Sequence, residues 1–174
     1  MASGPRTGYE DLVRCLRALP GRYSDLVNEY LVQARRDYGD EMRRFGPRVE
    51  SVLRAVLDFE GLKPIRPGPL YEEQEFVRPD VFVAPRAFVE VTKWSDTNKL
   101  ASMLAQGILV KRKEPDALYF AVIAGLGAKN TWSDAESVDF YLGGESQIGG
   151  VKVVDGYYGF KNVGHLVERL RREQ

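Results

Sequence analysis

Residues 78–94, RPDVFVAPRAFVEVTKW, carry two acidic side chains whose types and spacing could support chemistry. Valine occupies every second position on both sides of a turn at residues 84–86, so a period of two predicts two short strands. The valines then share one face, and Asp80 and Glu90 share the other. Burying a carboxylate is costly unless it is paired or bound to a metal. Two acids on one face, with a lysine close by, therefore indicate a divalent-metal site that could act on phosphodiesters.

Composition narrows the kinds of metal site that the chain could build. It has one cysteine, Cys15, and one histidine, His165, which argues against an internal disulfide and against zinc sites of the common kinds. Attention therefore falls on hard, oxygen-ligated ions such as Mg²⁺. Basic and acidic residues each number 25, so the formal net charge is zero. That balance gives no general electrostatic case for nucleic-acid binding, and any positive surface must be local.

Length and hydrophobicity predict one globular domain. The chain has 174 residues, of which 44% are hydrophobic, enough to bury a sizeable core. No apolar run approaches the roughly 20 residues that a membrane span needs. The first residues, MASGPRTGYEDL, lack the apolar segment of a secretory signal. We therefore expect a cytoplasmic protein without a membrane partner.

Periodicity predicts helices on both sides of the acidic stretch. Apolar residues at helical spacing indicate helices over residues 8–19, from residue 24 to Gly39, and from Pro47 to Gly61. Residues 63–74 read as a proline-rich loop. A helix is expected from a cap at residues 95–97 to about residue 113, followed by a buried strand at residues 118–124, LYFAVIA. A strand–helix–strand order implies parallel pairing, so the predicted fold is α/β, a central mixed sheet flanked by helices with a helical N-terminal region.

The last part of the chain gives weaker signals. A strand is expected at residues 138–142, a mobile turn at residues 143–150, and a hairpin of residues 151–154 and 157–160 about Asp155-Gly156. A final helix is predicted at residues 163–172. The glycines after residue 124 do not form the phosphate-binding GxxxxGK[ST] loop, so we expect no nucleotide site.

The acidic stretch resembles a known family. Pro79-Asp80 followed by Glu90-Val91-Thr92-Lys93 is similar to the PD-(D/E)xK nuclease superfamily, the fold of type II restriction endonucleases. The resemblance extends over residues 46–125. It implies a restriction-endonuclease-like core that binds one or two Mg²⁺ ions and cleaves double-stranded DNA, in a homodimer whose two-fold symmetry matches a palindromic site.

The resemblance also implies roles for individual residues. Asp80, Glu90 and the carbonyl of Val91 would bind the metal, and Glu50, on the helix before the strands, would add a further carboxylate. The family's lysine position is occupied by Thr92. Lys93 follows one residue later, and strict alternation points it away from Glu90 unless the strand bulges. Lys93 is the first candidate for the catalytic cation, and Lys99, on the next helix, is the second.

The rest of the predicted site concerns DNA. Some family members place a glutamine on the helix after the strands, a role that Gln106 could take beside Lys99. The insertion after the core is where restriction enzymes carry recognition elements, and its donors can contact bases and phosphates. The candidates there are Lys129, Asn130, Gln147, Lys152, Tyr157 and Lys161.

We therefore expect residues 1–174 to form one nuclease domain. Residues 1–45 would be its helical N-terminal part, 46–125 its catalytic core, and 126–174 a recognition hairpin with a C-terminal helix. The first alternative is a structure-specific nuclease, such as a Holliday-junction resolvase or a repair nuclease. The second is a non-catalytic DNA-binding subunit with a nuclease-like fold.

Overall fold

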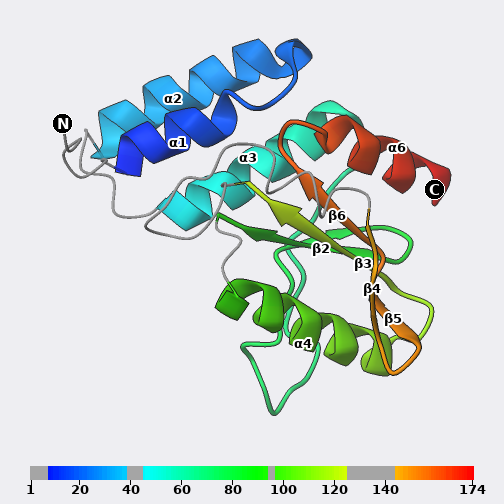
Figure 1. Ribbon diagram of the computed structural model, residues 1–174. Coiled ribbons are helices and arrows are strands. Elements are labelled where there is room, and N and C mark those ends of the chain that lie inside the picture. The colour runs from blue at the N-terminus through cyan, green and yellow to red at the C-terminus, as the bar shows by residue number, and fades with distance from the viewer. Residues whose placement is uncertain (1–7, 39–44, 94–96, 125–143) are drawn as a thin grey trace.

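The computed structural model describes residues 8–38, 45–93, 97–124 and 144–174 (Figure 1). The strand predicted at residues 138–142, the cap at Ser95, and the candidates Lys129 and Asn130 lie outside these ranges. Within them, no helix combines the length and the apolar character that crossing a membrane requires.

The chain contains both helices and strands, and its first part is helical. Their bounds are α1 (Gly8–Leu16), η1 (Gly21–Tyr23), α2 (Ser24–Tyr38), α3 (Phe45–Phe59), β1 (Val81–Val83), β2 (Ala87–Thr92), α4 (Thr97–Lys113), β3 (Leu118–Ile123), β4 (Ser146–Ile148), β5 (Val151–Val154), β6 (Gly156–Gly159) and α6 (Val163–Arg172). The first helix ends earlier than predicted, because Leu19 precedes Pro20 and residues before proline avoid the helical conformation. The other predicted helices agree to within a few residues.

The central sheet is mixed, as predicted. Its strand order is β1-β2-β3-β6. β1 runs antiparallel to β2, whereas β3 runs parallel to both of its neighbours. All six residues of β3 are buried, as expected for a strand covered on both faces.

Helices cover both faces of this sheet (Figure 1). On one face, α1, α2, α3 and α6 pack against Val81, Val89, Phe120 and Val122. The stripe of α3 predicted from the sequence is buried there without exception. On the other face, α4 and β5 enclose a second cluster around Phe88, Tyr119, Ala121 and Ile123. The alternation of the strands thus divides the core into two layers.

The predicted hairpin about Asp155-Gly156 is wrong. β5 pairs with β4, and β6 instead joins the central sheet beside β3. The hairpin that does form has Gly149-Gly150 at its turn, with φ values of 58° and 80° that suit glycine. Asp155 cannot serve as an exposed turn residue because its carboxylate is buried. It accepts hydrogen bonds from Lys111 Nζ at 2.6 Å and from the Tyr119 amide at 2.8 Å.

Gly107 brings α4 close to both sheets. A Cβ atom at this position would lie 2.3 Å from the carbonyl oxygen of Val153 and 3.0 Å from the Tyr119 ring. The next residue, Ile108, is 39% exposed. The side chain that turns inward beyond it is Lys111, which reaches Asp155.

We predict that Gly107→Ala destabilises the fold by about 1–3 kcal/mol, because the backbone of β5 or α4 must move to admit the methyl group. The matched control is Gly164→Ala in α6, where an added Cβ would meet only Arg22, at 3.9 Å. Removing a helical glycine there should stabilise the protein by up to about 1 kcal/mol. Urea unfolding of both variants measures the difference, and equal stabilities would contradict the close approach of α4.

Candidate functional site

The pairing of β1 with β2 brings Asp80 and Glu90 together. The register pairs Val81 with Val89, so Asp80, just before β1, stands opposite Glu90. The Val91 amide donates to Asp80 Oδ2 at 2.8 Å, and the Asp80 amide donates to Glu90 Oε2 at 3.2 Å. Each carboxylate thus accepts a hydrogen bond from a backbone amide of the opposite segment, just beyond the last regular pair of β1 and β2.

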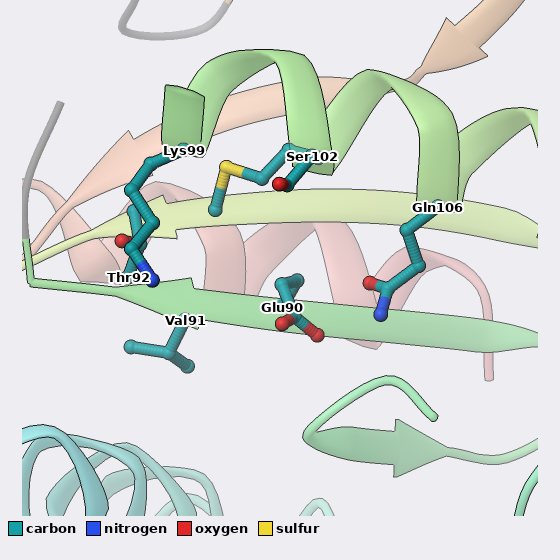
Figure 2. Close-up of a pocket in the computed structure, with 7 residues that line it drawn as sticks. Glu90, Val91, Thr92, Lys99, Ser102 and Gln106 are labelled. Carbon is teal, nitrogen blue, oxygen red and sulfur yellow. The ribbon is translucent and has the colours of Figure 1, made fainter. Parts of the chain in front are cut away.

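Glu90 points away from α3 and toward α4. Its neighbour Val89 belongs to the core under α3, and alternation places Glu90 and Thr92 on the other face. A pocket of about 110 Å³ lies between β2 and α4. Its lining consists of Glu90, Val91, Thr92, Lys99, Ser102, Met103 and Gln106. Figure 2 shows Lys99 and Gln106 reaching from the helix toward β2 on either side of Glu90, with Ser102 between them.

Gln106 connects Glu90 to the buried layer. Its carboxamide makes a hydrogen bond with Glu90. Its Oε1 accepts the Tyr119 hydroxyl proton at 2.6 Å, and Tyr119 is fully buried. Because the oxygen is occupied by Tyr119, the NH₂ group of Gln106 faces Glu90, as Figure 2 shows.

Burial and neighbouring carboxylates change the acidity of both carboxyl groups. Burial, reinforced by the neighbouring Asp80 charge, raises the pKa of Glu90 to about 9. Burial also raises the pKa of Asp80 to about 6, against the opposing effect of the Val91 amide. Without a cation, Glu90 therefore stays mostly protonated at neutral pH, because its charged form is poorly stabilised at this position. A cation bound between the two carboxyl groups would favour the ionised form of both.

Two further charged residues lie beside Asp80. The carboxyl group of Glu50, on α3, shares a hydrogen bond with Asp80 and repels its charge. Arg66 lowers the pKa of Asp80 by its positive charge. Arg66 comes next to Asp80 because Ile65 pairs with Phe82 along the outer edge of β1. The two residues exchange backbone hydrogen bonds of 2.8 and 2.9 Å. Glu50 thus lies where the sequence placed it, and Arg66 is an addition.

The structure also bears on the two candidate lysines. The register of β2 with β3 runs without a shift from Ala87 to Thr92, so no bulge in the strand turns the chain before Lys93. Thr92 lines the pocket beside Glu90, while Lys93 follows the last residue of the strand. Lys99 lines the same pocket from α4. Of the two lysines, Lys99 is the one brought to Glu90.

The described DNA candidates that follow the core lie in different settings. Gln147 is exposed on β4, Lys152 is paired with Glu145 at 2.9 Å, and Lys161 is exposed before α6. Tyr157 is only 4% exposed, and its hydroxyl is bonded to Ser146 at 2.7 Å. The prediction that Tyr157 contacts DNA is therefore wrong, because β6 pairs with β3 as the last strand of the central sheet and is not part of a surface hairpin.

Sequence reasoning missed three residues of this region. Arg66 stands in the proline-rich loop, where nothing in the sequence indicates that it pairs along β1. Tyr119 was read only as part of an apolar strand, although its hydroxyl is the one polar side-chain group in LYFAVIA and needs a partner when buried. Ser102 follows Lys99 by almost one helical turn, so its position on the same flank could have been found.

The donor set suits a hard divalent cation with few protein ligands. Within the described ranges, no group of three or more His, Cys, Asp or Glu side chains is arranged to hold a metal ion. Mg²⁺, however, is commonly held by one or two carboxylates and completed by water. Asp80 and Glu90 supply two carboxylates, the Val91 carbonyl is the predicted third ligand, and Glu50 stands beside Asp80. These oxygen donors fit Mg²⁺ better than a softer metal.

We predict that the metal-free protein loses stability as the pH rises. The pKa values of Glu90 and Asp80 are raised on folding, from 4.5 to about 9 and from 3.8 to about 6. The folded state then binds more protons than the unfolded state, so this contribution is complete below about pH 4. It declines as the pH rises from there, to about pH 6 for Asp80 and to about pH 9 for Glu90. Glu90→Gln should remove most of the slope and stabilise the protein at pH 8 by on the order of 1–2 kcal/mol.

Chemical denaturation from pH 5 to 9, in EDTA, measures this slope. Glu72→Gln, at an exposed position of the 63–74 loop, is the matched control and should leave the slope unchanged. A parent protein whose stability is flat across this range would contradict the burial of two interacting carboxyl groups. Adding Ca²⁺ should restore stability to the parent at pH 8 but much less to Glu90→Gln.

No protein-family model, curated protein or solved structure matches the chain.

Proposed function

We propose that the chain is a Mg²⁺-dependent endonuclease with a restriction-endonuclease-like core, which cleaves double-stranded DNA at specific sequences as a homodimer. The observation that carries the proposal is the juxtaposition of Asp80, just before β1, with Glu90, within β2, beside a pocket that Glu90 and Lys99 line. The mixed sheet, with one antiparallel and two parallel pairings, agrees with such a core.

The residues can divide the work of phosphodiester cleavage between them. Bound Mg²⁺ would supply Lewis acidity, which activates water and stabilises the leaving oxygen. Asp80 and Glu90 would hold the ion with their carboxylates, and Val91 would hold it with its carbonyl oxygen. Glu90 must lose its proton for this, so binding should strengthen as the pH rises toward 9. Lys99 would offset charge on the scissile phosphate and orient the attacking water.

Substrate class is tested with supercoiled plasmid and with branched DNA, each in Mg²⁺ and in EDTA. Discrete plasmid fragments that require Mg²⁺ support a site-specific endonuclease. Cleavage confined to branched DNA would instead identify a structure-specific nuclease. DNA left intact in Mg²⁺ and Mn²⁺, but retained by the protein in a gel-shift experiment, would identify a DNA-binding subunit. Sedimentation of the protein with and without DNA tests the homodimer.

Asp80→Asn should lower the cleavage rate by on the order of 10²–10³-fold. The amide oxygen of asparagine can still accept the Val91 amide, so the strand ends should keep their geometry. Asp116→Asn, at an exposed site before β3, is the control and should cleave like the parent. Circular dichroism establishes that both variants are folded. A folded Asp80→Asn protein with the parental rate would remove Asp80 from the site.

Lys99→Ala should lower single-turnover cleavage by on the order of 10²-fold, whereas Lys93→Ala should remain within a few-fold of the parent. The reason is that Lys99 lines the pocket beside Glu90, while Lys93 follows the end of an unbulged strand. Lys99→Arg retains the positive charge and should recover part of the rate. The reverse order of the two alanine variants would assign the catalytic cation to Lys93.

A further inference from the structure

The hydroxyl group of Tyr119 is fully buried at the centre of the molecule, on the face of β3 that α4 covers. Its partner in this layer is Gln106 Oε1, at 2.6 Å. Phenylalanine would provide nearly the same apolar packing as this buried tyrosine, so the hydroxyl group contributes mainly its hydrogen bond. The hydroxyl group therefore has a directional role toward Gln106, and Gln106 lines the pocket of the acids.

The position of Tyr119 is held from the main chain as well as from the ring. The Tyr119 amide donates to Asp155 Oδ2 at 2.8 Å, and the Asp155 amide donates to the Tyr119 carbonyl at 2.8 Å. Lys111 Nζ forms an ion pair with the same Asp155 oxygen at 2.6 Å. Gly107, next to Gln106, lies against the ring. The hydroxyl group thus has little freedom to leave Gln106.

We propose that Tyr119 is a positioning residue of the acidic site: its hydroxyl holds the Gln106 carboxamide so that the NH₂ group faces Glu90 and fixes the orientation of that carboxylate for a divalent cation. The inference rests on the proposed function, since it concerns the same metal site. It adds a residue from β3 that does not itself touch the metal or the DNA. Its effect passes through one side chain on α4.

In a carboxamide group the oxygen accepts hydrogen bonds and the NH₂ group donates them. If Gln106 rotated by half a turn, its oxygen would face the Glu90 carboxylate, and the two oxygens would repel each other. The Tyr119 hydroxyl opposes this rotation because its proton is donated to the carboxamide oxygen. Partners that orient a metal-binding side chain in this way typically change metal affinity by 10–100-fold when they are removed.

Tyr119→Phe tests the proposal, with Tyr157→Phe as its matched control. Both tyrosines are buried in the same layer, and each donates or shares one hydroxyl hydrogen bond, but Tyr157 bonds to Ser146 and not to Gln106. Calorimetric titration with Ca²⁺, which avoids DNA cleavage, should show about tenfold weaker binding for Tyr119→Phe. Tyr157→Phe should bind Ca²⁺ like the parent.

A double-mutant cycle with Gln106→Leu separates positioning from a general loss of packing. If the hydroxyl acts through the carboxamide, Tyr119→Phe has no further effect on Ca²⁺ affinity once Gln106 has been replaced. An equal loss of affinity in both backgrounds, or Tyr119→Phe binding Ca²⁺ like the parent, would overturn the proposal.

A readout on the metal-free protein distinguishes this inference from the function on which it rests. Parent protein that binds no Ca²⁺ would contradict the proposed metal site. NMR exchange of the Gln106 side-chain amide protons then decides the positioning role separately. Exchange at least tenfold faster in Tyr119→Phe, and unchanged in Tyr157→Phe, supports it. Equal exchange in the parent and both variants overturns it.

Discussion

The rest of the site depends on the burial of two like-charged carboxyl groups side by side at the edge of a sheet. Each group accepts an amide hydrogen bond from the strand segment opposite, which both satisfies that amide and holds the acid in place. These bonds do not cancel the unfavourable effects of burial and of the neighbouring charge, because the pKa values of both groups remain raised. The arrangement thus favours the protonated form of both groups until a cation is bound, and perturbed carboxyl groups of this kind are common at functional sites.

The sequence was sufficient where a local pattern and the tertiary structure agree. The alternation of valines with Asp80 and Glu90 predicted the shared face, because period two follows directly from strand geometry. The apolar run of β3 predicted burial on both faces, and the length of the helix before it predicted parallel pairing. The same alternation also identified Lys93 as out of phase with Glu90, although it could not decide between Lys93 and Lys99 as the catalytic cation.

The failures occurred where a local signal competed with a distant partner. Asp155-Gly156 is a strong turn signal, but the Asp155 carboxylate is bound by Lys111 and the Tyr119 amide, and these contacts cannot be read from nearby residues. Gly156 is required for a different reason, since a Cβ there would lie 2.9 Å from the Tyr158 ring. Tyr157 then enters the core with β6. Arg66 was missed for the same reason, because its place beside Asp80 depends on Ile65 pairing with β1.

The position of β6 has a consequence for the order in which the molecule can assemble. β3 lies between β2 and β6, and both pairings are parallel, so neither can form through a short local turn. During synthesis, β1 and β2 can pair as soon as residue 92 is available, before the helix and strand that support them exist. β3 must then wait, with an apolar edge exposed, until residues 156–159 emerge. The nascent chain therefore forms its acidic pair early, while the apolar β3 gains its second neighbour only when the last strand has been made.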